Sequence, residues 1–370
     1  MIISRKLIFT LFAIIPVFSF CQTNSDCSDV TISSATVNGS YTVNSYLESD
    51  GIRDGNDYYG STIYYPENTS GLLPSIIIIP GYANPQLSIQ TWGPFLASHG
   101  IVCMTIGTNN LFDEVIDRKE ALQDALISLK AEHIRVGSIL FNRLDTNLIA
   151  LGGWSMGGGG AQLLAAEDPN IKAILAFCPW IDPTVVSPAL LNHNTPILFF
   201  SGQIDVVAPP STHADIQYNY TPSSTNKLRY EVFGGGHTIA NSPVGGFGEV
   251  GRMGVSWLKK YLVNDSCYCP LLLDTPTTAT NPGYETNINC SISTNIVEYK
   301  NDLIIYPNPA NNTISLKGIL NKNNLYQIIS IDGKVLKSEV LKTSKIDVSF
   351  LKKGVYFLDY ENRKIKIIKN

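Results

Sequence analysis

Apolar residues in this chain form short, uninterrupted runs that alternate with stretches of helical periodicity. The strongest run, residues 75–79, has four isoleucines after Ser75 and ends at Pro80-Gly81, as expected of a strand buried on both faces. Similar runs follow at residues 101–106, 148–152, 171–177, 197–201 and 228–233. Strands that alternate with helices of this length predict an α/β fold with a mostly parallel sheet covered on both sides.

The segments between these runs carry helix signals. Leu122, Leu126 and Leu129 recur at positions i, i+4 and i+7, which places them on one face of a helix. A second helix is expected from just after Ser155 through Ala165. A last helix presents one apolar face, made of Val250, Met253, Trp257 and Tyr261. Residues 41–65 place aromatics, threonine and valine between turns, and predict antiparallel strands at the edge of the sheet.

The N-terminus has the pattern of an export signal. Arg5 and Lys6 precede an apolar run, residues 7–20, that is too short for a comfortable membrane span. We expect residues 1–21 to be the signal peptide, with cleavage near Cys21. A lipoprotein signal is disfavoured because the bulky Phe20, not a small residue, precedes Cys21. No other stretch approaches a membrane span, so we expect a secreted protein without an integral membrane segment.

Charge divides the chain into two modules. Residues 22–300 carry 13 lysines and arginines against 25 aspartates and glutamates, whereas residues 301–370 carry 12 against 6. The acidic part has no basic stripe interleaved with aromatics, which argues against a nucleic-acid partner. A length of 370 residues suits one sizeable domain plus a small one. We expect a large domain at 22–290, a linker at 291–302 and a C-terminal domain at 303–370.

The chemistry is indicated by Gly153-Trp154-Ser155-Met156-Gly157, which matches G-x-S-x-G. The motif lies between a predicted strand and a predicted helix. This is the context of a nucleophile elbow, a strained turn that exposes the serine hydroxyl above the sheet. Glycines flank the serine because a Cβ atom there would collide with the tight turn or a neighbouring strand. Ser155 is therefore the predicted catalytic nucleophile.

The expected partners follow in the chain order serine, acid, histidine. His237 stands in a glycine-rich loop after a predicted strand, where open α/β sheets place their chemistry. Asp205 follows the strand at 197–201 and is the favoured acid, with Asp182 as its rival. The remaining histidines are His99, which ends a predicted helix, and three expected to face solvent, namely His133, His193 and His213.

The loops around this motif suggest how an ester would be held. The backbone N–H of Met156, and that of Tyr82 after the strand at 75–79, are the expected oxyanion hole. Trp180 follows another strand, so it and the Tyr82 ring are candidate substrate contacts. About 16 residues separate Trp180 from Ile197, too few for a helical cap. We therefore expect an α/β-hydrolase fold without a cap domain and with an open, partly aromatic cleft.

Cysteine usage agrees with export. Cys103 and Cys178 lie in apolar runs and are expected to be buried free thiols. Four other cysteines flank the catalytic region at its two ends, and in an oxidising compartment they can form disulfides. They are Cys27, Cys267, Cys269 and Cys290. Their connectivity stays open, since four cysteines allow three pairings.

Residues 81–82, 91–100, 153–160, 179–180, 205–209, 236–237 and 240–241 together resemble the bacterial cutinases, and in particular the polyester hydrolases that include poly(ethylene terephthalate) hydrolases. The resemblance implies an oxyanion hole made by Tyr82 and Met156, and an ester site lined by Tyr82, Met156, Trp180 and Val207. It also implies a disulfide that uses Cys290. Separately from the resemblance, we expect no cofactor, no metal ligands among the site residues, and a monomer. One branch of the family has a second disulfide beside the site; Gly202 and Ile239 stand at those positions here.

The tail changes in character after Cys290. Short alternating strands are expected at 313–316, 326–331, 334–340, 346–349 and 354–356, with a hairpin turn at Asp332-Gly333. This is a small β-sandwich-like pattern. Its Tyr-Pro-Asn-Pro, Asp-Gly and Gly-Val-Tyr segments resemble the C-terminal sorting domain of type IX secretion. The resemblance implies that the type IX secretion machinery is a partner of this protein. A carbohydrate-binding or adhesive β module is the alternative.

Three functions remain in view. The first is a secreted, cutinase-like serine esterase that cleaves polyesters and short- or medium-chain esters through an acyl-enzyme. The second is a lipase or esterase that acts on soluble esters. The third is a catalytically silent adhesion protein that keeps the fold, which the complete set of Ser155, Asp205 and His237 disfavours.

Overall fold

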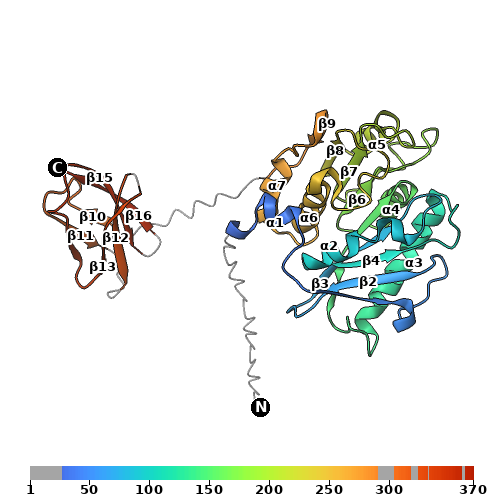
Figure 1. The fold of residues 1–370 in the computed structure, drawn as a ribbon, viewed down its shortest axis with the longest axis horizontal. Helices are drawn as coiled ribbons and strands as arrows, with labels where there is room; N and C mark the ends of the chain where they lie inside the picture. Colours follow the sequence, from blue (N-terminus) through green and yellow to red (C-terminus); the bar gives the residue numbers. More distant parts are fainter. Residues whose placement is uncertain (1–26, 291–303, 318–323, 332, 361–362) are drawn as a thin grey trace, which may run out of the picture. The chain divides into compact units, whose positions relative to one another are not determined.

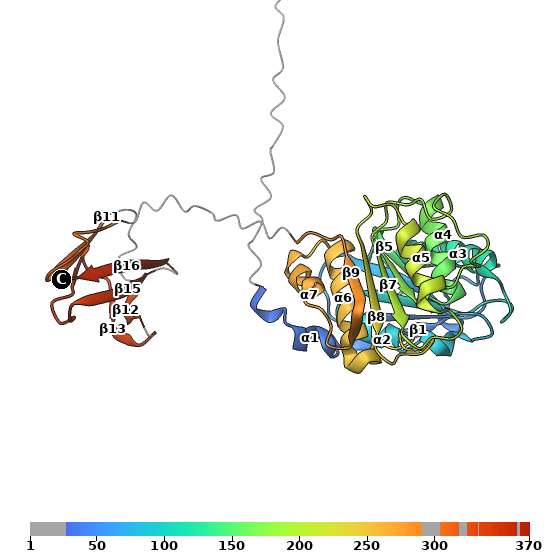
Figure 2. The same cartoon turned by 90° about the horizontal axis from the view of Figure 1, so that it is seen from above.

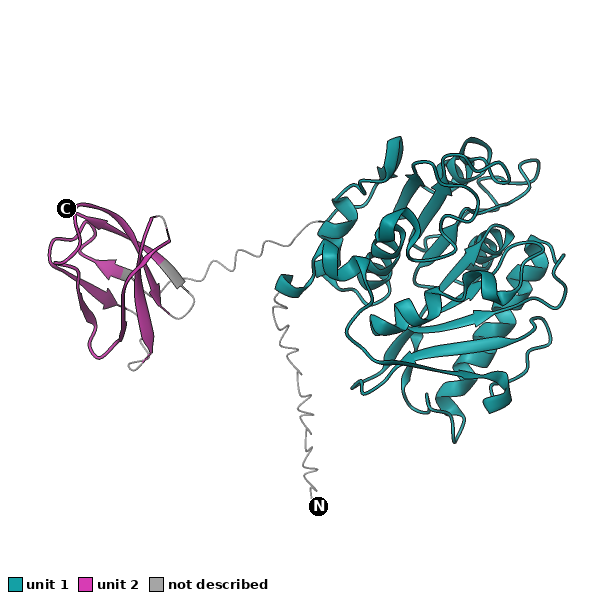
Figure 3. Cartoon of the chain, viewed as in Figure 1, with its two compact units in different colours: residues 1–290 teal, residues 291–370 magenta. Residues whose placement is uncertain are grey.

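The computed structural model describes residues 27–290, 304–317, 324–331, 333–360 and 363–370, and it divides the chain into two compact units, 1–290 and 291–370 (Figure 3). The predicted signal peptide (1–21), the linker (291–302) and Asp332 lie outside the described residues. We propose the domain boundaries 22–290 and 303–370 on the sequence pattern.

The first unit is built on a nine-stranded sheet in the order β1-β2-β4-β3-β5-β6-β7-β8-β9 (Figure 1). Six central strands are parallel, which confirms the predicted α/β fold. They are β3 (Leu73–Ile79), β4 (Val102–Ile106), β5 (Leu144–Trp154), β6 (Ile174–Phe177), β7 (Ile197–Gly202) and β8 (Lys227–Val232).

The edges of the sheet are antiparallel. At one edge, β1 (Val43–Leu47) and β2 (Ser61–Pro66) arise from the segment 41–65, as predicted. At the other edge, β9 (Ala279–Thr286) pairs antiparallel with β8. The sequence did not predict β9, because it contains Pro282 and Gly283 and has no apolar run.

Helices cover both faces of the sheet, and alternate residues of each strand pack on opposite faces. In β3, Ile76 and Ile78 join the core beneath α2 (Trp92–Ser98) and α6 (Glu249–Tyr261). Ile77 and Ile79 join the core beneath α3 (Val115–Ile134) and α4 (Met156–Glu167). Figure 2 shows these two helix layers on either side of the strands. Because all four isoleucines are buried, the strand has the continuous apolar run seen in its sequence.

The remaining helices are short. They are α1 (Ile32–Thr36), α5 (Ala214–Tyr220) and α7 (Cys269–Leu273), with single 3₁₀ turns at Cys27–Asp29, Glu48–Asp50, Gln86–Ile89, Pro210–Thr212, Gly245–Gly248 and Ser266–Tyr268. Between β6 and β7, residues 178–196 form turns but neither helix nor strand, so no helical cap is inserted there. No helix in the described part of the chain has the length and apolar character to span a membrane.

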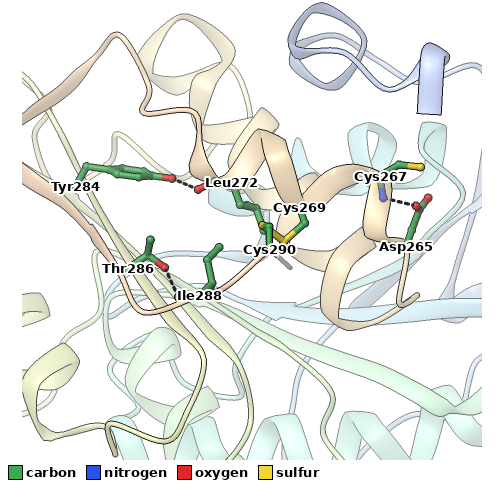
Figure 4. The surroundings of a disulfide bond; sticks show 8 residues. All are labelled: Asp265, Cys267, Cys269, Leu272, Tyr284, Thr286, Ile288 and Cys290. Atoms are coloured by element: carbon green, nitrogen blue, oxygen red, sulfur yellow. Dashed lines mark hydrogen bonds between the residues drawn. A yellow bond between two sulfur atoms is a disulfide. The ribbon is translucent and has the colours of Figure 1, made fainter. Parts of the chain in front are cut away.

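Two disulfides close the ends of this unit. Cys27 bonds to Cys267. Cys269 bonds to Cys290, as Figure 4 shows. This selects one of the three pairings that the sequence left open, and it includes the Cys290 bridge that the family resemblance implied. Cys103 and Cys178 are free and buried, as predicted.

The second unit consists of two antiparallel sheets, in the orders β10-β11-β14 and β13-β12-β15-β16. Side chains from both sheets share one small core that includes Ile314, Ile328 and Leu358. This agrees with the predicted small β domain. The strands are β10 (Ile304–Tyr306), β11 (Thr313–Lys317), β12 (Leu325–Ser330), β13 (Val335–Val340), β14 (Lys345–Asp347), β15 (Gly354–Tyr360) and β16 (Arg363–Lys369).

Candidate active site

Ser155 occupies the turn between β5 and α4. Its φ of 54° and ψ of −122° are a conformation that a residue with a side chain adopts only under strain. Backbone hydrogen bonds hold it there: its N–H donates to the carbonyl of Phe177 at 2.8 Å, and its carbonyl accepts from the N–H of Trp180 at 2.9 Å. The strand-to-helix turn expected of a nucleophile elbow is therefore present at this serine.

The glycines around Ser155 are required by close backbone contacts. A Cβ atom on Gly153 would lie 2.2 Å from the carbonyl carbon of Gly157, and one on Gly157 would lie 2.6 Å from the carbonyl oxygen of Pro80. A Cβ atom on Gly81 would lie 2.8 Å from the Cβ of Ser155 itself. The loop that follows β3 therefore passes directly beside the serine.

Asp205 and His237 are in direct contact. The Nδ1 atom of His237 lies 2.7 Å from Oδ2 of Asp205, whose side chain is fully buried. The other carboxylate oxygen accepts the N–H groups of Val207 and Ala208, at 2.9 and 2.8 Å. Burial by itself raises the pKa of Asp205, but the hydrogen bond from His237 and these backbone donors together outweigh it, so the pKa lies below its usual range.

The rival acid takes no part in this contact. Asp182 accepts from the N–H and the hydroxyl of Thr184, both at 2.8 Å, and so closes a local turn. The structure thus pairs His237 with the acid that follows β7, not with the one that follows β6.

Two tryptophans hold the histidine loop. The indole N–H of Trp154 donates to the carbonyl of His237 at 2.8 Å, and the two rings pack with centroids 5.2 Å apart. The indole of Trp92 donates to the carbonyl of Ala240 at 2.9 Å. Since Trp154 precedes Ser155 in sequence, this contact links the serine turn directly to the histidine loop. Sequence reasoning missed both tryptophans, because nothing local to either residue signals its partner.

The loops that carry Asp205 and His237 also approach each other closely at Gly202. A Cβ atom on Gly202 would lie 2.4 and 2.5 Å from the carbonyl oxygens of Gly235 and Gly236. The family resemblance placed a disulfide of one branch at this position. Here the two backbones approach so closely that a side chain at residue 202 has no room.

The predicted oxyanion donors belong to the same region. Met156 is the first residue of α4, so no carbonyl of its own helix accepts its N–H. Tyr82 follows Gly81 in the loop beside Ser155, and its ring is exposed. The substrate-contact candidates Trp180 and Val207 follow β6 and β7, and Val207 is exposed. All the predicted site residues thus lie just beyond the carboxyl ends of parallel strands.

Two histidines depart from expectation. The prediction that His193 and His213 face solvent is wrong, since their exposed fractions are 4% and 6%. The ring of His213 packs against that of Trp180, with centroids 6.0 Å apart. The Nδ1 atom of His193 bonds to the carbonyl of Thr195 at 3.0 Å, within the turn that leads into β7. Both are buried by segments that are distant in sequence, so polar neighbours in the chain do not reveal it.

Arg118 is a further residue that sequence reasoning missed. Its guanidinium is fully buried and donates to the carbonyls of Pro80, Leu111 and Asp113, at 2.9, 3.2 and 3.1 Å. Burial lowers its pKa to about 10. The carbonyl of Leu111 also accepts the N–H of Ala83. Arg118 therefore ties the loop that carries Tyr82 to the loop at 111–113.

A thiol lies close to the acid and the histidine. Ligand atoms of Cys178, Asp205 and His237 all lie within 4.8 Å of one another. Burial, followed by the nearby Asp205 carboxylate, raises the pKa of the Cys178 thiol far above its usual range. The neutral thiol is therefore the stable form, and it is a poor nucleophile.

The catalytic unit and the tail each match a described protein family. Residues 22–291 match the family described as PET hydrolase-like, and residues 304–370 match the secretion system C-terminal sorting domain. Cutinase 1 from Thermobifida cellulosilytica is 36% identical over 226 residues, 59% of this chain and 79% of its own length. A cutinase from Thermobifida fusca (strain YX) is 36% identical over 226 residues, 59% of this chain and 68% of its own length. Lipase 1 from Moraxella sp. (strain TA144) is 33% identical over 252 residues, 67% of this chain and 74% of its own length.

These similarities cover the catalytic unit and the tail separately. The cutinase and lipase relatives indicate a carboxylic ester hydrolase, and the sorting domain implies export by the type IX machinery to the medium or the cell surface. The chain thus belongs to the PET hydrolase-like family, as a secreted or cell-surface ester hydrolase with a C-terminal sorting domain.

Proposed function

We propose that the protein is a cutinase-like polyesterase that cleaves polyesters and short- or medium-chain esters with Ser155, His237 and Asp205 as its catalytic triad. The observation that carries the proposal is the 2.7 Å contact between His237 Nδ1 and the buried carboxylate of Asp205, in a site whose serine has the strained elbow conformation. A neutral imidazole whose Nδ1 proton is held by Asp205 leaves Nε2 free to accept a proton.

In the first half of the reaction, Ser155 Oγ attacks the ester carbonyl carbon while His237 Nε2 takes the hydroxyl proton. The carbonyl oxygen becomes an oxyanion, which the N–H groups of Tyr82 and Met156 stabilise. The C–O bond to the alcohol then breaks, and the alcohol leaves with the proton from His237. The acyl group stays on Ser155.

In the second half, water gives a proton to His237 and attacks the acyl carbon. The bond to Ser155 breaks, the carboxylic acid leaves, and Ser155 recovers its proton. Asp205 stays ionised throughout, which its lowered pKa favours, and stabilises the imidazolium that forms twice in the cycle.

A polymeric substrate is supported by the surface around the serine. Tyr82, Phe112 and Val207 are exposed apolar side chains on the loops of this region, and no helical cap is inserted between β6 and β7. A chain that cannot enter an enclosed pocket can lie on such a surface. The family description and the cutinase relatives support the same substrate class.

The alternative is a general lipase or esterase that acts on soluble esters, and the 33% identity with Lipase 1 supports the lipase. The triad chemistry is the same in both cases, so only the substrate distinguishes them. We expect the secreted enzyme to act as a monomer, which light scattering of the purified protein tests.

The test compares the wild-type chain with Ser155→Ala on a short p-nitrophenyl ester and on an amorphous aromatic polyester film. We expect the wild type to cleave both and the variant to cleave neither. Cleavage of the soluble ester alone would leave the triad standing and favour the soluble-ester alternative. Wild-type rates in Ser155→Ala would overturn the triad.

A further inference from the structure

A hollow of about 480 Å³ lies on the catalytic unit beside the Tyr82 loop. Its lining includes two highly exposed apolar side chains, Tyr59 and Leu87. The rest includes Pro85, Gln86, Gln90, Leu111 and residues 107–109, which follow β4. None of the predicted catalytic or substrate-contact residues belongs to it. It is therefore a second surface feature, apart from the one that holds the scissile ester.

We propose that this hollow is an auxiliary subsite that binds a neutral segment of the polyester chain whose scissile ester lies at Ser155. The proposal rests on the polyesterase function proposed above, and it extends the substrate contact to a part of the surface beyond Tyr82 and Phe112.

The hollow is continuous with the catalytic region through two loops. Leu111 lines it, and the next residue, Phe112, packs its ring 5.5 Å from that of Tyr82. Pro85 and Gln86 line it as well, and they follow Tyr82 closely along the same loop. The N–H of Ala83 donates to the carbonyl of Leu111 at 2.7 Å, which joins the two loops. An extended chain that crosses the exposed rings of Tyr82 and Phe112 therefore reaches the hollow.

The chemistry of the lining selects a neutral ligand. It contains no charged side chain, although the surrounding domain is strongly acidic. Tyrosine, leucine and proline offer apolar contact, and the exposed Tyr59 also offers a hydroxyl donor. The side-chain amides of Gln86 and Gln90 already donate to threonines of the fold. A polyester repeat has the matching pattern, because apolar rings or methylenes alternate with uncharged ester groups that accept hydrogen bonds. A volume of this size is within the range that holds a drug-sized molecule, which is comparable to one repeat unit.

One residue of the lining, Gln86, is held in place by hydrogen bonds to the fold. The amide nitrogen of Gln86 donates to the hydroxyls of Thr62 and Thr105, at 3.1 and 2.9 Å, and to the carbonyl of Thr105 at 2.7 Å. These bonds fix the loop to β2 and β4. A site that is already ordered loses little conformational entropy when a ligand binds, so more of the contact energy appears as affinity for long chains.

The experiment uses the full chain and two variants of the hollow, Leu87→Ser and Tyr59→Ser. Val136→Ser is the matched control: Val136 is also highly exposed and lies between the end of α3 and the start of β5, at the amino ends of the parallel strands. Release of soluble products from an amorphous aromatic polyester film, adsorption to that film, and kcat/KM on p-nitrophenyl butyrate are measured for each.

We expect each variant of the hollow to lower film hydrolysis and adsorption about 3- to 10-fold, the loss typical of removing one apolar contact. The control should match the wild type on the film, and all variants should match it on the soluble ester. Variants that equal Val136→Ser on a film that the wild type cleaves would overturn the subsite alone. A wild type that leaves the film intact would overturn the polyesterase function and the subsite with it.

Discussion

The catalytic region and the region where the chain enters and leaves the catalytic unit are held together in different ways. Among the described contacts of the catalytic region, backbone hydrogen bonds, buried donors and glycines fix the loops, and no disulfide does. At the chain ends, two disulfides converge on neighbouring residues, Cys267 and Cys269, one on each side of Tyr268. They fasten the first described residue, Cys27, and the last one before the linker, Cys290.

The difference follows from what each region must do. A chain end is connected to the fold on one side only, so it frays unless it is tied down, and a disulfide ties it without demanding a particular surface. A triad needs its atoms placed to within about 0.5 Å, and this placement comes from packed backbones and fixed donors. The disulfides thus stabilise the chain ends, whereas packed backbones and fixed donors set the geometry of the catalytic region. Substitutions can therefore test the two contributions separately.

The largest expected effect is on catalysis alone. Asp205→Asn keeps an acceptor for the N–H groups of Val207 and Ala208 but presents the wrong group to His237 Nδ1, so the imidazole no longer has the productive tautomer. We expect kcat on a p-nitrophenyl ester to fall about 10³- to 10⁴-fold. Thermal unfolding should stay close to that of the wild type. Activity near the wild-type level would remove Asp205 from the triad.

The next effect should fall on stability alone. All four tryptophans belong to the catalytic unit, so their fluorescence follows its unfolding in the full chain. Replacing Cys27 and Cys267 by alanine should lower the free energy of unfolding in urea by about 5 kcal/mol, and replacing Cys269 and Cys290 by about 3 kcal/mol, because the first bridge closes the longer loop. The folded variants should keep kcat within about twofold of the wild type. A large loss of kcat in folded protein would show that the two regions are coupled.

Arg118 tests whether a buried donor controls geometry. Lysine keeps the charge but cannot reach the carbonyls of Pro80, Leu111 and Asp113 together. Arg118→Lys should therefore let the loop of Tyr82 drift and lower kcat about 10- to 100-fold, with little change in KM, because the oxyanion contact is made in the transition state. Arg118 is thus a positioning residue. A variant that loses only stability, with kcat unchanged, would contradict this role.

Gly202 tests the contact between the two catalytic loops. Gly202→Ala inserts a Cβ atom into the carbonyls of Gly235 and Gly236, so the histidine loop must shift away from Asp205. We expect kcat to fall about tenfold, since a misplaced catalytic group loses rate steeply with distance. Gly236→Ala is the matched control, because a Cβ atom there has no neighbour within 4 Å. Equal kcat values for the two variants would argue against the contact as a determinant of geometry.

The smallest effect concerns acid stability. Burial lowers the pKa of His193 to about 4, from an ordinary value of 6.5. The unfolded chain binds a proton there between these two values and the folded chain does not, so stability is present above pH 6.5 and is lost as the pH falls toward 4. His193→Gln should reduce the difference in unfolding free energy between about pH 7 and about pH 5.5 by about 1 kcal/mol. An unchanged pH dependence would place the acid sensitivity elsewhere; His99, whose pKa is also lowered to about 4 by burial, is the next candidate.

Much of the fold was predictable because its signals are local. The continuous isoleucine run of β3 requires burial on both faces, and the spacing of Leu122, Leu126 and Leu129 fits only a helix. The strand β9 was missed because pairing with β8, and not its own polar sequence, makes it a strand. The burial of His193 and His213 was missed for the same reason, since they contact residues that are distant in the chain, Thr225 and Trp180 respectively.

The α/β class, the small β tail and the candidates Ser155, Asp205 and His237 follow from the amino-acid sequence, because each depends on a motif, a periodicity or a chain order within short segments. The pairing of the cysteines and the contact of His237 with Asp205 instead of Asp182 are seen only in the folded molecule. The same holds for the buried donors and the glycine that fix the surrounding loops, which are Arg118, Trp92, Trp154 and Gly202. Backbone propensity acts over a few neighbours, whereas such contacts exist only after the sheet has brought distant loops to the same edge.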